Sequence, residues 1–144
     1  MEKSRDIGYY FCFINREMEK AMNERLRKYD LTKSQQDILN FLHKSSKKMV
    51  IQKDIEEYFH ISNPTVTGIL NRLEQKGFIV RKTDERDRRI RTIVLTEKEE
   101  VYHQDIVDRI HEVEDSFDKI VGDRRDMFMD VLKELSESFE KEDK

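Results

Sequence analysis

A mainly helical fold with one small β-hairpin is predicted by three features of the 144-residue sequence. Apolar residues recur at steps of three and four through most of the chain, which is the spacing of amphipathic helices. One central stretch instead holds two runs rich in β-branched and aromatic residues on either side of a charged turn. Charged residues make up 41% of the chain, against one proline and four glycines. That composition favours long, solvent-exposed helices over a sandwich or a Rossmann fold, and the length is typical of one domain.

The segment from Ile61 to Thr96 is expected to form one short helix followed by the hairpin. Ser62 is a favourable N-cap, and Pro64 falls in the first turn, where a backbone N–H would have no partner. Gly77 can adopt the left-handed conformation that ends a helix. The apolar stripe of the helix consists of Val66, Ile69, Leu70 and Leu73, and the strands are expected at Phe78–Lys82 and Arg91–Leu95.

The opposite face of this helix is polar, and the turn of the hairpin, TDERDRRI, is rich in arginine. A short helix with a polar outer face can enter the major groove of DNA, and arginines at a hairpin tip can reach phosphates or the minor groove. The alternative for the turn is a solvated charge run, but its position directly after a capped, polar-faced helix favours DNA contact. The predicted DNA-binding residues are Asn63, Thr65, Thr67, Gly68, Asn71 and Arg72 on the helix, and Arg86, Asp87, Arg88 and Arg89 at the tip.

Three further helices are expected before this segment. Asp6–Tyr29 keeps a helical spacing of apolar residues for about six turns. Thr32 and Gln35 have the spacing of a capping box at the start of the second helix. The third is short and lies within Ile51–Phe59, where Ile51, Ile55, Tyr58 and Phe59 form its stripe. A short helix, a tight turn at His60 and Ile61, and a second capped helix constitute a helix-turn-helix, and the hairpin is its wing.

Two helices with narrow apolar stripes are expected after the hairpin, at Glu97–Val121 and Arg124–Phe139. Thr96 is the expected N-cap of the first, with Glu99 at the capping-box spacing, and Gly122 separates the two. Nothing in one chain is large enough to cover these stripes together with that of the N-terminal helix. The prediction is one domain, 1–144, in which residues 1–30 and 97–144 form a homodimerisation bundle and residues 31–96 form a winged helix-turn-helix lobe.

The charge distribution agrees with a nucleic-acid partner, although the net charge is −3. Residues 44–94 hold 12 Lys and Arg against 7 Asp and Glu, a net charge of +5, whereas the remainder holds 16 against 24. A basic lobe on an acidic scaffold is the distribution expected of a DNA-binding protein. The sequence has no apolar run of 18 residues, no signal peptide and a single cysteine, so a cytoplasmic protein with no membrane partner is expected.

Four strings resemble the MarR (multiple antibiotic resistance regulator) family of bacterial and archaeal regulators. They are LTKSQQDIL, IQKDI, TVTGILNRLEQKGFIVR and DERDRRIRTIVLTEKE, and the likeness covers nearly the whole chain. The last two strings, in this order and separation, are fairly specific. The resemblance implies a winged helix-turn-helix homodimer on a pseudo-palindromic double-stranded DNA operator. It also implies a repressor that is released by a small-molecule effector, phenolic or drug-like, or by an oxidant.

The resemblance also implies roles for individual residues. Thr65, Thr67, Asn71 and Arg72 look like the face that enters the major groove, Arg89 looks like the wing arginine that enters the minor groove, and Asp87 looks like its acidic partner. The sequence departs from the family pattern at two positions. Gly68 stands where many members have an arginine, so a base or phosphate contact is expected to be missing, and Glu99 stands where a glycine is common.

Other chemistry-bearing residues have weaker support. Cys12 invites comparison with the peroxide-sensing cysteines of some family members, but that position falls about one turn earlier, near Gly8, so a buried, inert cysteine is favoured. Tyr9, Tyr10, Phe13 and Arg16 could line an effector pocket, and core or interface packing is the stronger alternative.

No catalytic constellation, cofactor motif or metal-binding motif stands out in the sequence. His103 and His111 are eight residues apart, not the four that place two imidazoles on one ion. Surface histidines are therefore expected, and a site completed from another helix remains the alternative. The function classes in order are an effector-responsive DNA-binding regulator, a redox- or metal-sensing variant of it, and a winged-helix protein-interaction module; an enzyme is not expected.

Overall fold

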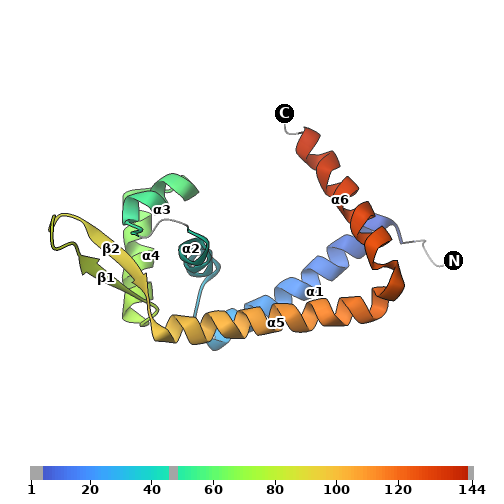
Figure 1. Ribbon diagram of the computed structural model, residues 1–144, viewed down its shortest axis with the longest axis horizontal. Coiled ribbons are helices and arrows are strands. Elements are labelled where there is room, and N and C mark those ends of the chain that lie inside the picture. The colour runs from blue at the N-terminus through green and yellow to red at the C-terminus, as the bar shows by residue number, and fades with distance from the viewer. Residues whose placement is uncertain (1–4, 46–48, 143–144) are drawn as a thin grey trace. The chain divides into compact units, whose positions relative to one another are not determined.

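The computed structural model describes residues 5–45 and 49–142, and the chain divides into two compact units, Met1–His103 and Gln104–Lys144. The described residues are mainly helical with one two-stranded antiparallel sheet (Figure 1), as the sequence predicts. The elements are α1 (Ile7–Lys28), α2 (Lys33–Lys44), α3 (Gln52–Phe59), α4 (Asn63–Gln75), β1 (Ile79–Thr83), β2 (Arg91–Leu95), α5 (Glu97–Val121), the short 3-10 helix η1 (Gly122–Arg124) and α6 (Arg125–Glu142).

The first two helices begin at caps that satisfy their free N–H groups. The Asp6 carboxylate accepts a hydrogen bond from the Tyr9 N–H at 2.7 Å. At the start of α2, the Thr32 hydroxyl accepts from the Gln35 N–H, and the Gln35 side chain accepts from the Thr32 N–H. This reciprocal pair is the capping box that the sequence predicts.

The helix-turn-helix is formed by α3 and α4. The Asp54 carboxylate accepts from the Ile51 N–H at 2.9 Å and so caps α3. His60 adopts a left-handed conformation, with φ of 54°, and reverses the chain direction at the predicted turn. The Ser62 hydroxyl then accepts from the Thr65 N–H at the start of α4, with Pro64 in the first turn.

The end of α4 is a Schellman motif. Gly77 has φ of 83°, its N–H donates to the Glu74 carbonyl, and the Phe78 N–H donates to the Leu73 carbonyl, both at 3.0 Å. The prediction that β1 begins at Phe78 is wrong by one residue, because the Phe78 N–H belongs to this motif. The strand pairing runs instead from Ile79 opposite Leu95 to Thr83 opposite Arg91.

The apolar stripe of α4 lies in the core of the first unit. Val66, Leu70 and Leu73 are fully buried, whereas Ile69 is only half-buried. Tyr58, which the stripe prediction placed inward, is 65% exposed, because the core position of α3 is taken by Ile55. The largest fully buried side chains of this unit are Tyr102, Phe78, Ile38, Leu39, Ile55, Leu70, Leu73 and Ile79.

Most of α1 has an exposed apolar face. Every residue from Arg5 to Lys20 is exposed, and Leu26 is the buried residue of the helix. Cys12 is therefore exposed in the single chain, and the expectation of a buried thiol is wrong for it. The reason is that no side chain of the first unit, within its described residues, covers this part of the helix.

The second unit contains the remainder of α5, η1 and α6. Gly122, with φ of 58°, separates the two helices at the predicted position, and Arg125 pairs with Asp118 at 2.7 Å. Ile106 is the single buried residue among the described positions 104–141. Several large apolar side chains of α6 are instead exposed, namely Met127, Phe128, Val131, Leu135 and Phe139.

None of the helices in the described ranges combines the length and the apolar character needed to cross a membrane.

Candidate nucleic-acid interface

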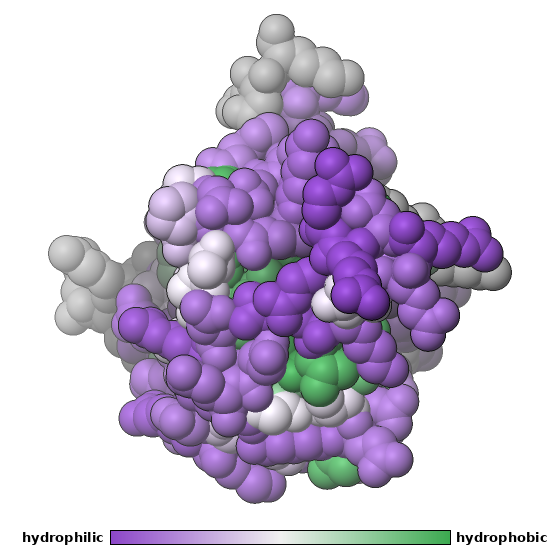
Figure 2. All heavy atoms as spheres, turned by 90° about the vertical axis from the view of Figure 1, so that its left-hand side faces the viewer, coloured by the Kyte–Doolittle hydropathy of each residue, from purple (hydrophilic) through white to green (hydrophobic). Residues whose placement is uncertain are grey.

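The outer face of α4 is exposed and polar beside the hairpin of the first unit. Thr65, Gly68, Asn71 and Arg72 are exposed. Viewed from the side on which the hairpin and α4 lie, the surface is largely hydrophilic (Figure 2). A polar helix face with a β-hairpin next to it is the geometry of a winged helix-turn-helix.

Two residues of this face are held by α3. The Gln52 side chain donates to the Thr67 hydroxyl at 2.8 Å and to the Asn63 carbonyl at 3.3 Å. The Asn63 side chain donates to the Glu56 carboxylate at 3.2 Å. The sequence did not predict that Gln52 supports the polar face of α4, because a polar residue of this kind follows no periodic pattern.

A second set of contacts connects α4 to the hairpin. Arg81, on β1, donates to the Asn71 side-chain carbonyl at 2.6 Å and forms an ion pair with Glu74 at 2.5 Å. Its side chain is 15% exposed, so much of the guanidinium is withdrawn from water. Asn71, one of the predicted DNA-binding residues, therefore already has a hydrogen-bond partner within the chain.

Arg72 and Gly68 are not held by side-chain contacts of this kind. Within the described ranges, the Arg72 side chain has no hydrogen-bond or ion-pair partner, so its donors are available to a ligand. A Cβ built at Gly68 would meet no atom within 4 Å outside its own stretch of helix backbone. The position is therefore open for the first atom of a side chain.

The tip of the hairpin is shaped by two aspartates. The Asp84 carboxylate accepts from the N–H groups of Arg86 and Asp87, at 2.6 and 3.2 Å. The Asp84 N–H donates to the Ile90 carbonyl at 2.9 Å, and the Ile90 N–H donates to the Asp87 carbonyl at 3.0 Å. Local hydrogen bonds of this kind fix a turn without a core.

Asp87 and Arg89 are paired, as the family resemblance implies. The Asp87 carboxylate accepts from the Arg89 N–H, Nε and Nη2 at 3.1, 3.1 and 3.2 Å. The hydrogen bonds from the Arg89 side chain, and then that from its backbone, lower the pKa of Asp87. The Arg89 side chain is nevertheless 90% exposed, so the pair orients the guanidinium while leaving it accessible.

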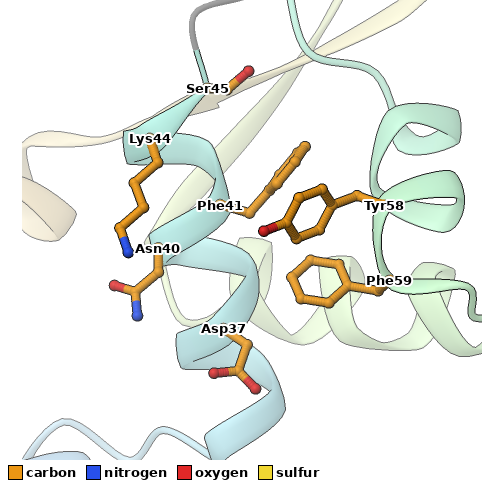
Figure 3. Close-up of a pocket in the computed structure, with 7 residues that line it drawn as sticks. All are labelled: Asp37, Asn40, Phe41, Lys44, Ser45, Tyr58 and Phe59. Atoms are coloured by element: carbon orange, nitrogen blue, oxygen red, sulfur yellow. The ribbon is translucent and has the colours of Figure 1, made fainter. Parts of the chain in front are cut away.

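The residues predicted to bind an effector lie on α1. The Tyr9 and Phe13 rings stack with centroids 6.3 Å apart, and both rings and Arg16 are exposed. A hollow of about 480 Å³ lies elsewhere, between α2 and α3, where the rings of Phe41, Tyr58 and Phe59 point toward one another (Figure 3). Its remaining lining residues are Asp37, Asn40, Lys44 and Ser45.

Comparisons with known proteins agree with this geometry. The MarR family model matches residues 29–90. The uncharacterised HTH-type transcriptional regulator YwoH of Bacillus subtilis is 30% identical over 120 residues, which are 83% of each chain. The chain belongs to the MarR family. The HTH-type transcriptional regulator SarZ of Staphylococcus aureus USA300 is 25% identical over 141 residues, which are 98% of this chain and 94% of SarZ.

Solved structures of the same kind match as well. A DNA complex of the S. aureus protein MepR has a TM-score of 0.82 at 26% identity, covering 92% of this chain and 98% of MepR. MepR bound to ethidium bromide has a TM-score of 0.76 at 25% identity, covering 94% of this chain and 97% of MepR. The chain is therefore a MarR-family winged-helix protein of the DNA-binding, transcription-regulating class, and its relatives are regulators and not enzymes.

Proposed function

We propose that this MarR-family chain forms a homodimer that binds a pseudo-palindromic operator and represses transcription until a small molecule releases it. The observation that carries the proposal is the pairing of Asp87 with an accessible Arg89 beside the exposed face of α4. In this arrangement α4 would occupy the major groove and Arg89 the adjacent minor groove. The DNA complex of MepR, a similar protein, supports the assignment.

The dimer would be formed by residues 1–30 and 97–144. Support comes from the apolar faces of α1 and α6, which are exposed in the single chain, and from the scarcity of buried residues after Gln104. The part of α5 after Gln104 and α6 bury too few side chains to fold stably on their own. A second copy of the chain would cover both apolar faces. The operator would then have a two-fold symmetry that matches that of the dimer.

The proposal is tested by mapping and titrating an operator. Footprinting on the DNA upstream of the chain's own gene should show a protected, pseudo-palindromic site. Binding to that duplex should weaken steeply with salt, since each phosphate neutralised contributes about 0.9 to the slope of log K against log salt. A salt-independent interaction, or equal affinity for the site and a scrambled duplex, would refute sequence-specific DNA binding.

The release step has its own probe. Ethidium bromide is bound by MepR, so it is a reasonable first ligand for this chain. If the α1 residues form the effector site, Phe13→Ala and Arg16→Ala should weaken ethidium binding and ethidium-induced loss of operator binding together. Tyr58→Ala, in the hollow between α2 and α3, is the matched control. Weakening by Tyr58→Ala alone would move the effector site to that hollow.

A further inference from the structure

A cluster of three metal-ligand side chains lies in the first unit, and none of the three is a predicted DNA-binding residue. His43 is near the end of α2, and Glu99 and His103 are one turn apart on α5. One ligand atom from each residue can be chosen so that all three lie within 4.8 Å of one another. The His43 Nε2 and the Glu99 Oε1 are already 2.6 Å apart, and the rings of His43 and His103 stack with centroids 3.6 Å apart.

The central carboxylate is buried and incompletely satisfied. Glu99 is 1% exposed, and its Oε2 has no hydrogen-bond partner among the described residues. Leaving a buried carboxylate oxygen without a partner is costly, and buried carboxylates are normally paired or bound to a metal. The unsatisfied oxygen is therefore free to act as a ligand atom in this cluster.

The N-terminal cap of α5 does not depend on the Glu99 side chain. The Thr96 hydroxyl accepts from the Glu99 N–H at 3.3 Å, but the Thr96 N–H donates to the Phe78 carbonyl and not to the Glu99 side chain. The capping box expected from the sequence is therefore only half formed. Its carboxylate is directed instead toward His43, which is 56 residues away in the sequence.

We propose that His43, Glu99 and His103 bind a divalent transition-metal ion of the zinc class, with water as a fourth ligand. Two imidazoles and one carboxylate are the donors of many open zinc sites. Tetrahedral coordination at about 2.0–2.1 Å puts ligand atoms about 3.3 Å apart. The candidate atoms lie within 4.8 Å of one another and the His43 and His103 rings are stacked, so metal binding requires the two rings to rotate out of the stack. The ion would neutralise the buried carboxylate and join the end of α2 to the start of α5.

The protonation of the cluster agrees with this role. Burial, and then the charge of His43, lower the pKa of His103, which favours the neutral imidazole that a metal requires. Burial is the largest influence on Glu99 and raises its pKa, while the hydrogen bond and the charge of His43 oppose that shift. A bound cation would stabilise the carboxylate form.

The direct test is a Zn²⁺ titration of the full chain, stripped of metal with a chelator, by isothermal titration calorimetry. One saturable site per protomer, at micromolar Kd or tighter, is expected. His103→Ala should weaken binding at least tenfold, whereas His111→Ala, an exposed histidine on the same helix, should not. Cys12→Ser should also bind normally, which removes the exposed thiol as the ligand.

A second measurement covers the case in which His103→Ala fails to fold. Zn²⁺ should raise the unfolding temperature of the parent chain, because it binds the folded state, and it should not raise that of Glu99→Gln. Absence of saturable binding by the parent, or equal binding by His103→Ala and His111→Ala, would overturn the proposal. The His43–Glu99 contact would then be an ordinary buried hydrogen bond. Neither measurement uses DNA, so its outcome is independent of the operator proposal.

Discussion

The Asp87–Arg89 pair gives a prediction that simple electrostatics contradicts. Removing a carboxylate near phosphates should strengthen binding if only net charge matters. In the structure, however, two hydrogen bonds from the Arg89 side chain to Asp87 hold an otherwise exposed guanidinium in one direction. Asp87→Ala releases that guanidinium, so we expect weaker operator binding despite the lost negative charge.

The magnitude of the Arg89 contribution follows from counterion release. Arg89→Ala removes one charge contact per subunit, or two per dimer, and should lower the salt slope by about 1.8. Between about 50 and 200 mM salt, the parent should then lose about 12-fold more affinity than the variant. Lys119→Ala, a basic residue outside the winged helix-turn-helix lobe, should leave the slope unchanged.

The assay is a double-mutant cycle on one operator, measured by fluorescence anisotropy at both salt concentrations. If Asp87 acts by orienting Arg89, Asp87→Ala should weaken binding in the parent and should no longer do so in the Arg89→Ala background. Tighter binding by Asp87→Ala in the parent would refute the orienting role. An equal loss in both backgrounds would show that Asp87 acts through another residue, such as one of the neighbouring arginines.

Three further predictions concern the helices. Gly68→Ala should stabilise the chain by about 0.8–1.0 kcal/mol in urea unfolding, because the site is an open helix interior; no gain would show that the backbone there is not helical. Replacing Phe128 and Leu132 with aspartate should give monomers in sedimentation and abolish operator binding, unlike Lys133→Asp; retention of the dimer would place the interface elsewhere. Alanine at Thr65, Thr67, Asn71 or Arg72 should each cost about 1–3 kcal/mol at particular operator positions, and equal losses on random DNA would mean backbone contact alone.

Local signals in the sequence were sufficient for the element order. Thr32 with Gln35, Ser62 with Pro64, and Gly77 each act within one turn of the chain, so their residue types are enough to predict the helix ends. The MarR-family fold follows from that order. The one-residue error at Phe78 arose because a Schellman motif uses the N–H that a strand would otherwise pair.

Contacts between elements could not be predicted in the same way. Gln52 reaches Thr67 across 15 residues, and His43 reaches Glu99 across 56. Polar residues that meet at such separations follow no helical or strand period, so each looks like an ordinary surface residue in the sequence. Glu99 illustrates the difficulty, because its spacing from Thr96 predicts a capping box that the structure only half forms.

Contacts between elements also involve the exposed polar face of α4, which is predicted to bind DNA. Arg81 contacts Asn71 and Glu74 at once, so a single guanidinium holds β1 against the outer side of α4. Removing the Asn71 side chain would therefore free one of the Arg81 donors as well as remove a candidate base contact. Arg72 has no such tie within the described residues, and its substitution tests groove contact alone. A change of base preference by Arg72→Ala is consequently the cleaner evidence for direct readout, while Asn71→Ala should alter base preference and wing position together.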